Sequence, residues 1–138
     1  MTSPLDRLVG LSLMAEPPDG KEFAGLRNSG LKRLNDAGNP ANSLEGRFDL
    51  AYNAAHALCL AALRYHGFRP QNRYIVFQVL PHTLCLGPEV WRVLAKCHQL
   101  RNLGEYEGDL NIDGRILSDL IAACRAVASK LDALPQLP

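Results

Sequence analysis

Hydrophobic residues recur at steps of three and four along most of the chain, which is the spacing of one face of an α-helix. A Ser3-Pro4 start and the apolar positions after it predict an N-terminal helix over about 4–15. Ser43 is a suitable N-cap for the longest predicted helix. The other predicted helices cover about 21–37, 44–66, 88–105 and 113–132. This pattern predicts an all-α fold, an antiparallel four- to five-helix bundle, as one domain over 1–138 with a core over about 22–132.

One apolar stretch, residues 74–80, fits either a short helix or a strand. Ile75, Val76, Phe77 and Val79 are residue types that favour strands. Because the pattern shows no second strand with which this stretch would pair, a short helix is the preferred interpretation.

Composition narrows the class of protein. The chain has 138 residues, of which 47% are hydrophobic and 21% charged, as in ordinary globular domains. Its 15 Lys and Arg against 14 Asp and Glu give a net charge of +1, which argues against general coating of nucleic acid. Any contact with nucleic acid then needs a local basic patch, or else the basic side chains simply form a solvated surface. The candidates for such a patch are Arg64, His66, Arg69, Arg73, Arg92 and Lys96.

The cysteines and the apolar runs bear on compartment and cofactors. Cys59, Cys85, Cys97 and Cys124 are widely spaced, without a Cys-x-x-Cys pair or histidines at zinc-ligand spacing. We therefore expect free thiols in a reducing cytoplasm, and neither a metal nor another cofactor. No apolar run is long enough to cross a membrane, and the first residues do not resemble a signal peptide, so no membrane association is expected.

Arg101 interrupts the apolar stripe of the helix predicted over 88–105. It follows Val90, Leu94 and Cys97 at helical spacing, so its guanidinium is directed toward a core or an interface and needs a partner. One interpretation is an intrahelical ion pair with Glu105, one turn further on. The other is a functional arginine at the end of the bundle, with Asn102 and Tyr106 beside it.

These residues resemble the signature of the HEPN superfamily, which is an arginine, four to six residues and a histidine, with Asn, Asp or His favoured after the arginine. Leu100–Tyr106 is similar to the form found in small stand-alone HEPN-like proteins, and the segments 48–55 and 67–69 resemble the same group. The resemblance covers about residues 22–132. It implies a helical bundle that forms a homodimer with the motif arginines near the interface.

The resemblance also implies a function. Active members are metal-independent ribonucleases of toxin–antitoxin and other defence systems, in which the arginine holds the scissile phosphate and the histidine assists proton transfer. In this chain Tyr106 stands where the histidine is expected, and tyrosine is a poor base at neutral pH. One hypothesis is therefore an RNA-directed protein that uses Arg101, Asn102 and Tyr106. The alternative is a catalytically inactive module that binds RNA, a nucleotide or a protein, with a nucleotidyltransferase or an antitoxin as its partner.

A polar stripe on the helix predicted over 44–66 offers a further candidate site. Asp49, Asn53 and His56 follow one another at steps of four and three residues on an otherwise apolar helix. They form either a solvated face with a hydrogen-bonded histidine or, if they face Arg101, a polar pocket that brings an imidazole to the site.

Overall fold

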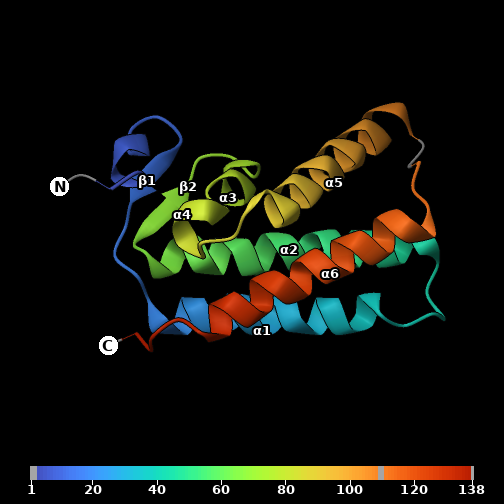
Figure 1. The fold of residues 1–138 in the computed structure, drawn as a ribbon, viewed down its shortest axis with the longest axis horizontal. Coiled ribbons are helices and arrows are strands. Elements are labelled where there is room, and N and C mark those ends of the chain that lie inside the picture. The colour runs from blue at the N-terminus through green and yellow to red at the C-terminus, as the bar shows by residue number, and fades with distance from the viewer. Residues whose placement is uncertain (1–2, 109–110, 138) are drawn as a thin grey trace.

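Four long helices form the body of the protein. The structure, a computed structural model, describes residues 3–108 and 111–137, without the side chains of 105–107. The long helices are α1 (Gly20–Ala37), α2 (Leu44–Tyr65), α5 (Pro88–Glu107) and α6 (Gly114–Asp132). Figure 1 shows α1, α2 and α6 running side by side, while α5 diverges from α2 toward its C-terminal end. The predicted helical bundle is confirmed, and none of the helices described is long and apolar enough to cross a membrane.

The helix starts follow from local capping. The side chains of Asp19, Ser43 and Asp113 accept hydrogen bonds from backbone N–H groups in the first turns of α1, α2 and α6. Pro88 occupies the first turn of α5, where its missing N–H costs nothing. The bounds of these helices therefore agree with the sequence prediction to within a few residues.

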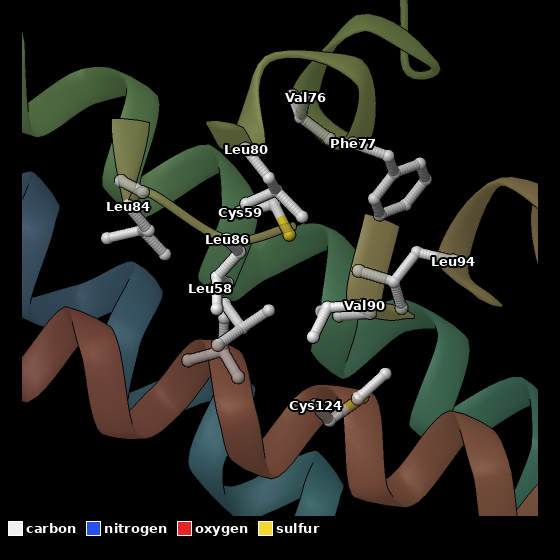
Figure 2. Packing of buried hydrophobic residues seen from close by; sticks show 14 of the residues in the cluster. Leu58, Cys59, Val76, Phe77, Leu80, Leu84, Leu86, Val90, Leu94 and Cys124 are labelled. Atoms are coloured by element: carbon white, nitrogen blue, oxygen red, sulfur yellow. The ribbon is translucent and has the colours of Figure 1, made fainter. Parts of the chain in front are cut away.

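Helix α2 is the centre of the core. Its alanines are almost all buried, so neighbouring helices approach it closely. One close approach is at Gly30 of α1, where a Cβ atom would lie only 2.7 Å from Cγ of Leu58. In Figure 2, side chains from α2, α3, α5 and α6 meet in one cluster that includes Phe77, Leu94 and Cys124.

The N-terminal segment differs from the prediction. Instead of a helix over 4–15, it contains a single 3-10 turn, η1 (Asp6–Leu8), and a strand, β1 (Leu13–Ala15). Gly10, at φ +86°, turns the chain between them, and β1 pairs antiparallel with β2 (Phe68–Pro70). The helix prediction was wrong here because the positive φ at Gly10 ends the helical path. The expectation that the chain has no paired strands was also wrong, since strands of three residues are too short to show an alternating pattern.

The stretch over 74–80 forms a helix, as preferred from the sequence. It contains α3 (Ile75–Gln78), followed directly by α4 (Leu80–Thr83). The side chain of Asn72 accepts a hydrogen bond from the backbone N–H of Ile75 and so fixes the start of α3. This places the residues just before α3 beside the middle of α2.

Four charged residues join the N-terminal segment to the end of α2. Arg64 is only 2% exposed, and its Nε donates to Glu22 Oε1 at 2.5 Å while its other nitrogens donate to the carbonyl oxygens of Glu16, Pro17 and Phe68. Arg69 bonds the carboxylates of both Glu16 and Glu22. We call Arg64, Arg69, Glu16 and Glu22 the Arg64 cluster. The hydrogen bonds from Arg69, more than any other interaction, hold the pKa values of the Glu16 and Glu22 carboxyl groups below their usual range. The same bonds raise the pKa of Arg69.

Candidate functional site

Aromatic, basic and amide side chains from three segments meet beside the middle of α2. Tyr52 and His56 lie one turn apart on α2, and α3 with the residues before it supplies an arginine and two rings. Helix α5 contributes three polar side chains, at positions 98, 101 and 102, which helical spacing brings to one face. We call this group the Tyr52 cluster, and its members are Tyr52, Asn53, His56, Arg73, Tyr74, Phe77, His98, Arg101 and Asn102.

The ring of His98 is fixed through both of its nitrogens. Its Nδ1 lies 2.8 Å from the hydroxyl oxygen of Tyr52, and its Nε2 lies 3.1 Å from Nδ2 of Asn102. Tyr52 is fully buried, and the Tyr74 ring lies 5.0 Å from the His98 ring between centroids. Two hydrogen bonds and a packed neighbour therefore hold this imidazole in one orientation.

Two guanidinium groups lie over the same aromatic ring. The Cζ atom of Arg101 is 4.8 Å from the centroid of Tyr52, and that of Arg73 is 5.6 Å from it. Arg73 Nη2 also donates to Oδ1 of Asn53 at 3.3 Å, which is a contact with a neutral amide. Within residues 3–108 and 111–137, Arg73 forms no ion pair. Two positive charges converge here on a ring, an arrangement that favours the binding of an anion.

His56 is half-buried beside these charges. Its ring meets the Phe77 ring edge-on, with 6.4 Å between centroids. The pKa of His56 is lowered to about 4, first by burial and then by the charges of Arg73 and Arg101 and the nearby His98. Burial, followed by the same two arginines, also lowers the pKa of His98. Both imidazoles are therefore neutral at neutral pH and able to accept a proton.

The structure brings together several residues singled out from the sequence. Arg101 and Asn102 of α5 lie in the same cluster as Asn53 and His56 of α2. Asp49 is exposed, and its part in the cluster is limited to its backbone oxygen, which accepts from Nδ2 of Asn53 at 2.9 Å.

Two predicted site residues lie where their side chains are outside the described part of the chain. Glu105 and Tyr106 belong to the last turn of α5. The proposed ion pair between Arg101 and Glu105, and the role of Tyr106, therefore remain predictions.

Sequence reasoning missed four members of the cluster: Tyr52, Tyr74, Phe77 and His98. His98 lies three and four residues before Arg101 and Asn102, so helical spacing already places the three on one face. Tyr52 follows Phe48 and precedes Ala55 at the spacing of an apolar helix face, so the sequence indicates a core residue. Its hydroxyl contact with α5 depends on how the two helices pack and cannot be inferred from local spacing.

Three arginines of the predicted basic patch, at positions 64, 69 and 73, divide between two clusters. Arg64 and Arg69 are paired with carboxylates, whereas Arg73 joins the Tyr52 cluster.

Comparison with protein-family models, with curated proteins and with solved structures finds no match for this chain. In the described part of the chain, no group of three or more His, Cys, Asp or Glu side chains is arranged to hold a metal ion. Function is therefore inferred from the chemistry of the Tyr52 cluster.

Proposed function

We propose that this chain is a HEPN-like, RNA-directed protein of a toxin–antitoxin or defence system, and that the Tyr52 cluster binds an RNA phosphodiester and cleaves it without a metal ion. The observation that carries the proposal is the pair of guanidinium groups, from Arg73 and Arg101, over the ring of Tyr52. They concentrate positive charge next to two neutral imidazoles.

This set of groups meets the needs of metal-independent RNA cleavage. A planar guanidinium binds two phosphate oxygens at once, and its charge stabilises the additional negative charge that develops on them in the transition state. Attack by the ribose 2′-hydroxyl also requires a group that accepts its proton, and a neutral imidazole is suited to this. Arg101 and Arg73 supply the first function, and a neutral imidazole of the cluster supplies the second. Asn102 supports the site through its contact with His98.

The proposal extends to assembly and location. The chain acts as a homodimer in the cytoplasm and needs no cofactor. Its protein partner is an antitoxin or a nucleotidyltransferase, and RNA is its substrate.

A second candidate function is binding without catalysis. It is favoured by the contacts of His98, whose ring nitrogens are both occupied, and by Tyr106 at the position where the motif has a histidine. On this interpretation the arginines bind RNA or a nucleotide while a protein partner supplies any activity.

A binding and cleavage assay separates these functions. The purified protein is incubated with a labelled oligoribonucleotide, with and without a chelator, beside Arg101→Ala and Arg92→Ala. Arg92 is the matched control, because it lies on the same helix and its guanidinium is also over an aromatic ring, that of Trp91, at 5.5 Å.

The proposal predicts cleavage that persists with the chelator, falls at least tenfold in Arg101→Ala and is unchanged in Arg92→Ala. Binding without cleavage supports the second candidate. Absence of binding contradicts both. Sizing in solution tests the assembly separately, and a monomer at micromolar concentration contradicts the homodimer.

A further inference from the structure

The two imidazoles of the Tyr52 cluster have different surroundings. His98 has a hydrogen-bond partner at each ring nitrogen, Tyr52 at Nδ1 and Asn102 at Nε2. The imidazole of His56 makes no hydrogen bond with the described residues, and its ring packs edge-on against the Phe77 ring. Proton transfer needs a ring nitrogen that can reach the substrate, and this condition distinguishes His56 from His98.

We propose that His56 is the catalytic base of the site, and that His98 is a positioning residue held by Tyr52 and Asn102. This inference rests on the proposed function, because it assigns roles within the same RNA-cleaving site. It places the imidazole on α2, whereas the sequence motif would place it after Arg101 on α5.

The reaction step is balanced with water as the only additional reactant. A ring nitrogen of His56 takes the proton of the ribose 2′-hydroxyl while the 2′ oxygen forms a bond to phosphorus. The bond between phosphorus and the 5′ oxygen breaks, and the departing 5′ oxygen takes a proton from water. His56 then returns its proton to solvent. The products are a 2′,3′-cyclic phosphate and a 5′-hydroxyl, and Arg101 and Arg73 bind the non-bridging oxygens throughout.

Burial and the charges around His56 keep its imidazole in the neutral form, which is the form that can accept a proton. The groups that act on it are Arg73 before α3 and His98 and Arg101 on α5, and each of them disfavours the protonated ring. Among the described residues, no carboxylate is among the groups that shift its titration. Its pKa of about 4 keeps it in the base form across the physiological range.

The position of Phe77 explains how two histidines from different helices serve one site. The centroid of the Phe77 ring is 6.4 Å from that of His56 and 6.0 Å from that of His98, so both imidazoles pack against this one ring. It also contacts the ring of Tyr52 at 6.0 Å. Because Phe77 is fully buried, this arrangement is rigid and is set by the core rather than by a loop.

Two measurements test the assignment. The first is the ring nitrogen spectrum of the protein by NMR, with a 2′-O-methyl oligoribonucleotide that binds but cannot be cleaved. We expect the His56 signals to shift on binding while His98 keeps one tautomer, and we expect Tyr52→Phe to change the His98 signals without substrate.

The second measurement is cleavage by His56→Asn and His98→Gln, with His82→Asn as an exposed histidine control outside the cluster. We expect His56→Asn to lower kcat about 100-fold or more, as is typical of a lost general base, while affinity for the 2′-O-methyl probe stays within threefold. His82→Asn is expected to match the wild type. The wild-type profile of kcat/KM against pH should be flat between pH 6 and 8 and fall toward pH 4.

The outcomes distinguish this inference from the proposed function. Failure of the wild type to bind the probe overturns both. Cleavage that is lost in Arg101→Ala but kept in His56→Asn overturns the inference alone, as does binding that leaves the His56 signals unmoved. A wild type that binds the probe without cleaving the unmodified RNA also overturns it.

Discussion

The two arginine clusters of this protein hold their charges in opposite ways. In the Arg64 cluster, two guanidinium groups face two carboxylates, and the side chain of Arg64 is almost completely buried. In the Tyr52 cluster, the guanidiniums of Arg73 and Arg101 lie over a ring and beside amide and imidazole groups. The segment from Arg64 to Phe77 contributes to both clusters: its first residues belong to the Arg64 cluster and its last residues to the Tyr52 cluster.

The difference separates a structural role from a binding role. A buried guanidinium with carboxylate and carbonyl partners has its hydrogen-bonding capacity met by the fold, so its removal mainly affects stability. The guanidinium of Arg73, which is held by a cation–π contact and a hydrogen bond to a neutral amide, is oriented while its charge can still attract an incoming anion. The predictions below test this comparison.

The largest effect is expected from Arg64→Met. The substitution keeps much of the volume but removes the donor to Oε1 of Glu22 and to the carbonyl oxygens of Glu16 and Pro17, while Arg69 still bonds Oε2 of Glu22. We expect the free energy of unfolding in urea to fall by about 3–5 kcal/mol. The control is Arg27→Met, which removes the exposed pair with Asp132 and should cost about 0–1 kcal/mol. Equal losses in the two variants would contradict the structural role of Arg64.

A pH effect of about 3 kcal/mol is expected from His56, whose pKa falls from 6.5 in the unfolded chain to about 4 in the fold. Between these values the unfolded state binds the proton and the folded state does not, so stability decreases as the pH falls from 6.5 to 4. His98 acts in the same direction. Urea unfolding at a series of pH values should show this slope, and His56→Gln should flatten it.

The contribution of the Arg64 cluster to stability changes at a lower pH than that of His56. Because the pKa values of Glu16 and Glu22 are lowered, their contribution is present above the ordinary glutamate value of 4.5 and is lost only as the pH falls below it. A stability slope above pH 5 that is unchanged in His56→Gln would contradict the assignment of that slope to His56.

A smaller loss, about 1–2 kcal/mol, is expected from Tyr52→Phe. The variant keeps the ring under both guanidiniums but removes the hydroxyl partner of His98 in a buried place. Tyr65→Phe is a matched control, since its hydroxyl donates to the backbone oxygen of Pro135 at an exposed position. Thermal unfolding compares the two, and a Tyr52→Phe variant as stable as the wild type would show that the hydroxyl is not needed to hold His98.

The smallest effect on stability is expected from Arg73→Gln. Arg73 is exposed and its hydrogen bond to Asn53 is 3.3 Å long, so unfolding should change by no more than about 0.5 kcal/mol. Its affinity for a single-stranded oligoribonucleotide should nevertheless fall several-fold, and the slope of log affinity against log salt should decrease by about 0.7. Fluorescence anisotropy at several salt concentrations measures both. A stable variant with unchanged binding would remove Arg73 from the site.

The sequence predicted the long helices well because their signals are local. Helix α6 has an apolar face and an N-cap in Asp113, and α2 has the same signals with Ser43. The N-terminal segment was mispredicted because β1 is stabilised by β2, more than fifty residues away, and short-range periodicity contains no information on that pairing.

The site was predictable in part for the same reason. Arg101 and Asn102 stand in a recognisable motif, whereas the contact between Tyr52 and His98 joins two helices and depends on how they pack. The spacing of apolar residues before Arg64 could also have predicted that its side chain is buried. Arg64 follows Ala57 and Ala61 at helical spacing on a buried face, the same pattern that marked Arg101 as an inward-facing arginine.

The hydrogen bonds of the Arg64 cluster also bear on the order in which the chain folds. Helices α1 and α2 follow each other closely in sequence and pack extensively, so they can associate early and rapidly. The bonds from Arg64 and Arg69 to Glu16, the residue after β1, close loops of 48 and 53 residues and join the N-terminal segment to the end of α2 and to β2. We therefore expect the N-terminal strand to dock late, so that its contacts slow unfolding more than they speed folding.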